Sequence, residues 1–234
     1  MAITLFGSRG SGSAAVEMAL RAAGLAYGVV RASTWEPDSA RDELRRVNPL
    51  GQIPALVLDD GTVLTESAAI LIHLGLEFPG HGLLPERAAD RAVALRGLVF
   101  IAANCYPAVS ISDYPERWTT AVSKTAQARV RAAARARLHQ HWGIFFDQFA
   151  GELERTRARP GALAFLAVVV SRWSGARQSL RAAAGGGWSA LLAELEAHPR
   201  LAGVLREHEA GADADEDEDA PADGGADPGG AAAA

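Results

Sequence analysis

Residues 47–70 read VNPLGQIPALVLDDGTVLTESAAI, and the order of apolar runs and turn signals in this stretch decides the fold of the N-terminal part of the chain. Pro54 to Leu58 is a short β-type run, and Asp60-Gly61 after it is a strong hairpin signal. Thr62 to Leu64 then predicts the returning strand. From Glu66 to Glu77 the apolar residues recur at helical spacing. The stretch therefore predicts a β-hairpin followed by a helix.

The residues before this stretch supply two more strands and two more helices. We expect strands at Ile3–Phe6 and Tyr27–Arg31, and helices at Ala14–Ala23 and Pro37–Arg46. A loop rich in Gly and Ser, residues 7–13, joins the first strand to the first helix. The resulting order, β-α-β-α-β-β-α, predicts an α/β domain over residues 1–80.

The chain beyond residue 85 shows no strand-like alternation and predicts a second, all-α domain over residues 86–209. A helical pattern interrupted by Pro107 comes first. The helices expected here are Arg87–Ser112, Lys124–Glu154, Ala162–Trp173, Trp188–Ala197 and Arg200–Glu209.

The end of the chain, residues 210–234, is expected to be an acidic disordered tail. It holds eight acidic and no basic residues, and its Ala, Gly, Asp, Glu and Pro composition offers nothing apolar enough to offset the entropy of ordering. Without this tail the net charge of −5 becomes +3, so the folded body is mildly basic. The tail is either a solvated extension, the interpretation we favour, or an interaction segment.

Several classes of protein are disfavoured by simple counts. The longest apolar run, Ala162 to Val170, is too short to span a bilayer, and the N-terminus lacks a signal-peptide pattern, so we expect no membrane partner. Cys105 is the single cysteine, which excludes an intrachain disulfide and, with the other counts, favours a cytoplasmic location. His139 and His141 do not face each other on a helix, so no metal site is expected. The Arg-rich run Arg129–Arg137 predicts a solvated helix face rather than a nucleic-acid surface.

The motifs of residues 47–70 resemble the glutathione S-transferase superfamily. The family pattern N-P-x-G-[KQ]-[VI]-P-x-L, a D-G hairpin and then E-S-x-A-I is present without a gap. The resemblance implies a thioredoxin-like N-terminal domain followed by an all-α helical-bundle domain. It also implies a transferase that conjugates glutathione, its co-substrate, to a small electrophile or reduces a peroxide, and that forms a homodimer.

The resemblance assigns a glutathione-binding role to residues around the motif. It implies a cis bond before Pro54, with the backbone of Ile53 pairing with the cysteinyl unit of glutathione like an added strand. It further implies that Ser67 donates to the γ-glutamyl carboxylate at a helix N-terminus, that Glu66 meets the ammonium group and that Gln52 reaches the glycyl end. The alternative is that Glu66 and Ser67 merely cap the helix.

The catalytic position is less well defined. The family keeps the thiol of glutathione as a thiolate beside a hydroxyl or thiol at the first helix N-terminus, and alignment places Gly10 and Gly12 at the positions that carry it. We therefore propose the neighbouring Ser11, expected to point out of the turn, with Ser13 second and Ser8 third. The alternatives are that these serines only cap the helix, or that backbone N–H groups alone hold the sulfur.

Three features remain in the helical half. Tyr106 and Trp118 are expected to line the second-substrate pocket, and Cys105 to be a buried, inert thiol. The family begins a buried helix with S/T-x-x-D, where this chain has Gly161 and Ala164, so a side-chain cap is missing.

These departures keep a second function open, a glutathione S-transferase-like binding or regulatory protein without turnover. A third, a zeta-like isomerase, is disfavoured because the loop lacks that class's S-S-C-S-x-R run.

Overall fold

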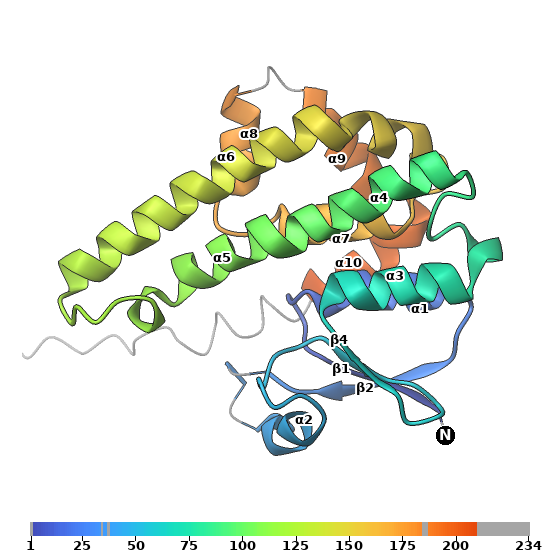
Figure 1. The fold of residues 1–234 in the computed structure, drawn as a ribbon, viewed down its shortest axis with the longest axis horizontal. Coiled ribbons are helices and arrows are strands. Elements are labelled where there is room, and N and C mark those ends of the chain that lie inside the picture. Colours follow the sequence, from blue (N-terminus) through green and yellow to red (C-terminus); the bar gives the residue numbers. More distant parts are fainter. Residues whose placement is uncertain (1, 34, 37, 184–186, 210–234) are drawn as a thin grey trace, which may run out of the picture.

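The computed structural model describes residues 2–33, 35–36, 38–183 and 187–209. Figure 1 shows a small sheet covered by helices and joined to a larger helical part. The expected acidic tail, residues 210–234, lies outside the described residues, so its disorder stays a prediction.

The sheet has four strands in the order β2-β1-β3-β4. Strand β1 pairs in parallel with β2, with Leu5 opposite Val29, and antiparallel with β3, with Leu5 opposite Leu56. The hairpin predicted around Asp60-Gly61 is confirmed as the antiparallel pair β3–β4. The strand bounds are Ile3–Gly7 (β1), Tyr27–Arg31 (β2), Ala55–Val57 (β3) and Val63–Thr65 (β4).

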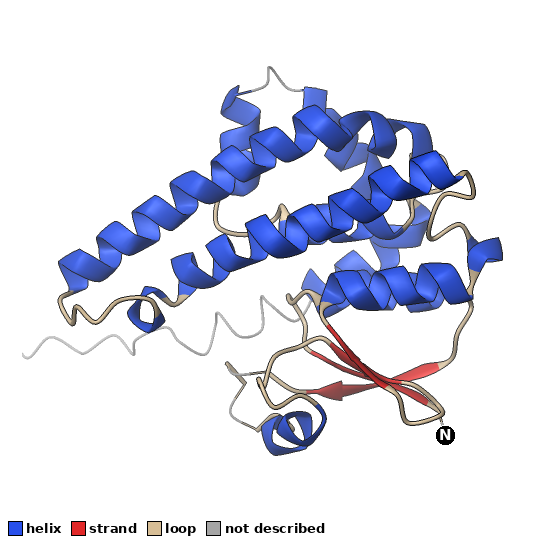
Figure 2. Cartoon of the chain, viewed as in Figure 1, coloured by secondary structure: helices blue, strands red, loops and turns tan. Residues whose placement is uncertain are grey.

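Helices cover both faces of the sheet (Figure 2). Side chains alternate along β1, so Leu5 faces the core made with α1 and α3, whereas Phe6 faces the opposite side and packs with Leu44 of α2. The helix bounds are Ser13–Ala22 (α1), Arg41–Val47 (α2) and Ser67–Glu77 (α3), followed by a 3₁₀ turn, η1, at Pro79–His81. The N-termini of α1 and α3 thus lie on the face of the sheet that meets the helical domain.

The rest of the described chain is helical, as the sequence predicts. All nine residues of α7 are buried, and they pack with the aromatic residues of α6, among them Trp142 and Phe145. The elements are α4 (Ala88–Phe100), the π-helical segment η2 (Ile101–Cys105), α5 (Tyr106–Asp113), η3 (Pro115–Arg117), α6 (Lys124–Thr156), α7 (Ala162–Val170), α8 (Ala176–Ala183), α9 (Gly187–Ala197) and α10 (Pro199–Glu209). The predicted fold class is confirmed, and α8 is the helix that the sequence pattern does not predict.

The helix predicted over Arg87–Ser112 continues through Pro107 instead of breaking there. Pro107 lies in the first turn of α5, where its missing N–H is least costly, directly after the π-helical segment. The run Ala88–Asp113 is long and apolar enough to cross a membrane by length and composition. It packs on α6 and α7, and core helices of soluble proteins pass the same test.

Helix α7 begins without a side-chain cap, as predicted, and the backbone of a distant loop replaces that cap. Gly161 is the N-cap residue, and the N–H of Ala162 donates to the carbonyl of Leu83 (2.8 Å). A Cβ at Gly161 would lie 2.5 Å from that carbonyl oxygen. Glycine is therefore required at Gly161 for the loop to approach the helix.

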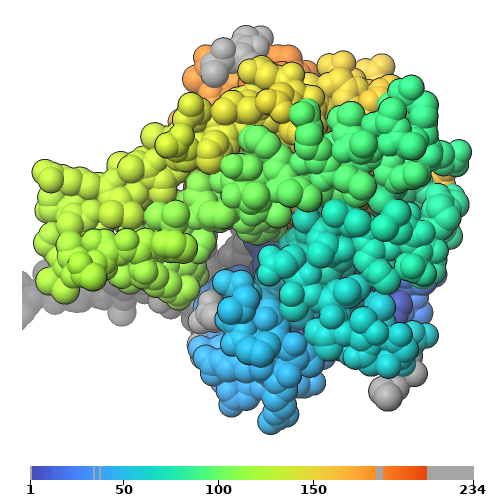
Figure 3. Space-filling model, in the orientation of Figure 1, coloured from blue at the N-terminus to red at the C-terminus, as the bar shows by residue number. Residues whose placement is uncertain are grey.

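In Figure 3 the yellow-green tip, formed by the end of α5 and the start of α6, projects beyond the N-terminal domain.

Candidate functional site

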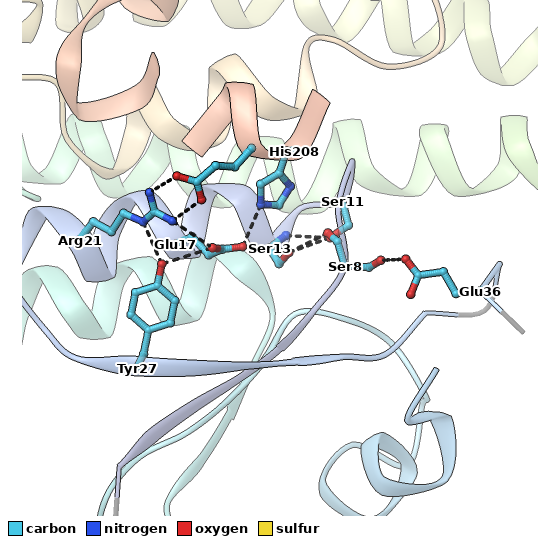
Figure 4. Close-up of polar contacts among 9 residues, drawn as sticks. Ser8, Ser11, Ser13, Glu17, Arg21, Tyr27, Glu36 and His208 are labelled. Carbon is cyan, nitrogen blue, oxygen red and sulfur yellow. Dashed lines mark hydrogen bonds and ion pairs between the residues drawn. The ribbon is translucent and has the colours of Figure 1, made fainter. Parts of the chain in front are cut away.

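The loop between β1 and α1 holds its serine hydroxyls inward (Figure 4). The hydroxyl of Ser11 donates to the carbonyl of Ser8 (2.7 Å), and that of Ser13 reaches the same carbonyl (3.1 Å). The two hydroxyls also contact each other at 2.9 Å. Ser8 itself donates to Glu36, in the segment between β2 and α2 (2.5 Å). All three serines are buried, so their hydroxyls hold the loop together.

The expectation that Ser11 points out of the turn is wrong, because its side chain is 7% exposed and faces the loop interior. Its oxygen also accepts from the N–H of Ser13 (3.2 Å), while its own N–H donates to Ser8 (3.4 Å). Of the three backbone N–H groups from Ser11 to Ser13, only that of Gly12 lacks a partner among the described residues.

The Ile53–Pro54 peptide bond is cis, as the resemblance implies. Just before it, the side chain of Asn48 donates to the carbonyl of Gln52 (2.7 Å) and fixes the turn. Within the described part of the chain, the backbone N–H and C=O of Ile53 make no hydrogen bond. Ile53 therefore offers both backbone groups to an extended peptide. The side chain of Gln52 is exposed.

Glu66 and Ser67 lie at the start of α3, and neither side chain caps the helix. Glu66 is the N-cap residue, but no side-chain cap hydrogen bond is formed, and its φ of 65° is unusual for a residue with a side chain. Its side chain is exposed. Ser67 is buried, and its hydroxyl lies 3.2 Å from the hydroxyl of Tyr106 in the helical domain. The sequence pattern does not predict the Glu66 backbone conformation, and it does not predict that Ser67 is the residue that contacts Tyr106.

Tyr106 reaches across the domain boundary to Gly12. A Cβ at Gly12 would overlap the Tyr106 hydroxyl and would lie 3.4 Å from the hydroxyl oxygen of Ser67. Burial raises the pKa of Tyr106 to about 12, so its hydroxyl keeps its proton at neutral pH. The N-termini of α1 and α3 and the start of α5 therefore meet at one point.

The other predicted residues of the helical half lie apart from this point. Trp118 follows η3 and is 55% exposed, and no ring contact or hydrogen bond joins it to Tyr106 within the described ranges. The ring of Tyr106 instead packs edge-on against Trp173, with 5.7 Å between ring centroids. Cys105 is fully buried, as expected, and burial raises the pKa of its thiol to about 12.

A second polar cluster joins α1 to α10 (Figure 4). His208 lies 2.8 Å from Glu17, and because a carboxylate oxygen only accepts, the ring nitrogen donates. Tyr27 donates to the other oxygen of Glu17 (3.2 Å), and Arg21 makes an exposed two-bonded pair with Glu207. This cluster fixes the last helix against the first. Over the described ranges, no group of three or more His, Cys, Asp or Glu side chains is arranged to hold a metal.

Comparison with known proteins identifies the family. Residues 13–76 match the family model described as the N-terminal domain of glutathione S-transferase. The chain is also 31% identical over 143 residues to glutathione S-transferase GstA of Escherichia coli O157:H7, covering 59% of this chain and 71% of GstA. The chain belongs to the glutathione S-transferase superfamily.

This superfamily member is also similar to a second sequence relative and to a solved structure. It is 37% identical over 117 residues to YncG, an uncharacterized GST-like protein of Escherichia coli K12; the match covers 50% of this chain and only 57% of the length of YncG. A solved ternary complex of BphK, a bacterial GST, superposes with a TM-score of 0.69 at 26% identity, covering 88% of this chain and 99% of BphK. The thioredoxin-like domain and the helical domain of this glutathione S-transferase superfamily member thus follow the known architecture.

Proposed function

We propose that this protein binds glutathione with its cysteinyl unit paired to the backbone of Ile53. The observation that carries the proposal is that the N–H and C=O of Ile53, next to the N-terminus of α3, have no hydrogen-bond partner in the described part of the chain. Glutathione is a peptide, and its extended backbone needs such a donor and acceptor pair. Membership of the glutathione S-transferase superfamily supports this proposal.

The two ends of glutathione meet the polar groups on either side of Ile53. The first N–H groups of a helix are unpaired and carry a partial positive charge, so the start of α3 suits the γ-glutamyl carboxylate, with Ser67 as an additional donor. We expect the carboxylate of Glu66, which is exposed, to meet the γ-glutamyl ammonium. The exposed Gln52 side chain serves the glycyl end.

The proposed reaction is transfer of the glutathione sulfur to a small electrophile. The thiol of bound glutathione loses its proton to water, and the thiolate forms a carbon–sulfur bond while the electrophile releases its leaving group. For a peroxide, the thiolate forms a sulfur–oxygen bond while the O–O bond breaks, and the leaving oxygen takes up a proton and departs as an alcohol or water. The glutathione sulfur is thereby oxidised to a sulfenic acid, which condenses with a second glutathione thiol to give glutathione disulfide and water. Both reactions need the sulfur held as an anion near Gly12, the family's position for a thiolate-stabilising side chain.

Calorimetry with glutathione tests the binding step. Ser67→Ala should weaken glutathione binding about tenfold or more, because a hydrogen bond to a charged group is lost. Ser123→Ala is the matched control. The hydroxyl of Ser123 caps α6 by accepting from Ala126 (3.2 Å), far from the site, so this variant should bind like the unmodified protein. Equal affinity of Ser67→Ala and the unmodified protein would contradict the site.

The second candidate function is glutathione binding without turnover. It is favoured by the loop, where Gly10 and Gly12 carry no side-chain donor and the hydroxyls of Ser11 and Ser13 are committed to Ser8. Turnover of 1-chloro-2,4-dinitrobenzene separates the two functions. Retention on immobilised glutathione with no turnover would support the binding protein.

A further inference from the structure

We infer that Tyr106, on the first turn of α5 in the helical domain, supplies the hydroxyl that holds the glutathione sulfur as a thiolate. In this protein the thiolate site is therefore completed by the second domain instead of by the β1–α1 loop. The inference rests on the proposed glutathione binding and names a further catalytic residue for it.

The position of the Tyr106 hydroxyl is the first argument. It occupies the space that a side chain on Gly12 would fill, so the N-terminus of α1 cannot carry both that hydroxyl and a Ser, Thr or Cys side chain. The loop serines offer no substitute, because Ser11 and Ser13 are buried and bonded to the Ser8 carbonyl. Gly12 and Tyr106 thus behave as a complementary pair, in which the missing side chain makes room for a hydroxyl from elsewhere.

The available proton is the second argument. Tyr106 has one hydroxyl proton, and among the described residues its hydroxyl makes one hydrogen-bond contact, to the hydroxyl of Ser67 at 3.2 Å. When glutathione is bound, Ser67 donates to the γ-glutamyl carboxylate. The Tyr106 hydroxyl then has two possible acceptors, the Ser67 oxygen and the glutathione sulfur. A hydrogen bond to an anion is about twice as strong as a neutral one, so the proton turns to the thiolate.

The rigid setting of Tyr106 is the third argument. Its backbone N–H donates to the carbonyl of Ile101, five residues earlier, which is the wide turn of a π-helix. Such turns occur frequently at functional sites. His141 of α6 supports the turn by donating to the carbonyl of Asn104 (2.8 Å), and Trp173 packs against the Tyr106 ring. The hydroxyl is therefore held in place before glutathione binds, which is what stabilisation of a developing anion requires.

No covalent bond to Tyr106 forms or breaks. The thiol of glutathione releases its proton to water, and Tyr106 keeps its own proton while donating a hydrogen bond to the sulfur. The N–H of Gly12, which has no partner among the residues that the structure describes, is available as a second donor. The thiolate is then consumed by the electrophile, and Tyr106 returns to Ser67.

The test is the ultraviolet absorbance of the bound thiolate, titrated against pH at saturating glutathione, with binding measured by calorimetry on the same variants. Tyr106→Phe removes only the hydroxyl and should raise the pKa of the bound thiol by about one to two units while glutathione still binds. Gly12→Ala should do the same by displacing the hydroxyl. In Gly12→Ser with Tyr106→Phe, the new hydroxyl enters the vacated space, and the titration should return toward that of the unmodified protein. Tyr114→Phe, whose ring lies under Arg117 away from the site, should change nothing.

The outcomes separate this inference from the proposed function. Glutathione bound to Tyr106→Phe and Gly12→Ala with titration curves that superimpose on the unmodified curve would overturn the role of Tyr106 and leave the binding site standing. An unmodified protein that binds no glutathione would overturn the proposed function and this inference together.

Discussion

Two helices of this protein, α1 and α7, begin at a glycine where the family resemblance predicts a polar side chain. Neither Gly12 nor Gly161 forms a side-chain cap. In both places another part of the chain fills the space of the missing Cβ: the Tyr106 hydroxyl at Gly12 and the Leu83 carbonyl at Gly161. The two glycines differ in what fills that space, since one neighbour is a side-chain tip and the other is backbone.

That difference separates a structural substitution from a chemical one. At Gly161 the carbonyl of Leu83 accepts the N–H of Ala162, which is the task of a helix cap, so the replacement restores stability. At Gly12 the space is filled by the Tyr106 hydroxyl, which can donate its proton in a hydrogen bond at the N-terminus of α1. A helix end that gains an acceptor is satisfied, whereas one that gains a donor is prepared for an anion.

The largest effect is expected at Gly161. In Gly161→Ala the new Cβ would meet the backbone oxygens of Leu83 (2.5 Å) and Gly82 (2.9 Å), which cannot move without displacing the loop. The free energy of unfolding, measured with urea, should fall by about 2 to 3 kcal/mol. Gly203→Ala in α10 is the control, because a Cβ there meets no atom of the described residues within 4 Å. This substitution should stabilise the protein by about 0.5 to 1 kcal/mol. Equal effects of the two variants on the free energy of unfolding would contradict the claim that the Leu83 carbonyl requires glycine at Gly161.

The Gly161 cap also shows how far the sequence could predict this fold. Residues 47–70 predicted the hairpin and α3, because turn residues and apolar spacing are local signals. The absence of a side-chain cap at Gly161 was equally visible. Its replacement by Leu83 was not, since the two residues are far apart in sequence and the contact uses backbone atoms. Helix α8 was missed because its segment is only eight residues long and polar on average, although its few apolar residues do recur at helical spacing.

The contact between α1 and α10 is made by side chains, and breaking it should have an intermediate effect on the free energy of unfolding. In His208→Ala the buried oxygen of Glu17 loses its donor, and the free energy of unfolding should fall by about 2 kcal/mol. Glu207→Ala removes the neighbouring pair with Arg21, which is exposed, and should cost about 0.5 kcal/mol or less. Urea unfolding of both variants gives the measurement. A larger loss in Glu207→Ala would mean that the exposed pair, and not the buried one, joins α10 to α1.

The candidate site was predictable in its residues and not in its orientations. The motif indicated Pro54, Glu66 and Ser67, and the cis bond before Pro54 is confirmed. The direction of the Ser11 hydroxyl was predicted wrongly, because any of several acceptors can capture a serine in a Gly-rich loop and only the folded loop shows which one does. Tyr106 was expected to line the second-substrate pocket. The sequence signal for a further role of Tyr106 was Gly12, a glycine at a position where the family resemblance predicts a hydroxyl or thiol side chain.

The smallest effect is expected at Ser11, and it decides whether the comparison of the two glycines holds. Ser11→Ala removes the acceptor of the Ser13 N–H and one donor to Ser8, so the free energy of unfolding should fall by about 1 kcal/mol. The pKa of bound glutathione should not move, because the Ser11 hydroxyl faces the loop interior and Tyr106 is untouched. Ser13→Ala is the matched control, since it keeps the bond from the Ser13 N–H to Ser11 and should cost less. A raised thiol pKa in Ser11→Ala would show that the loop provides its own hydroxyl after all. In that case Gly12 would be an ordinary turn glycine, and only Gly161 would depend on a distant group to complete its helix.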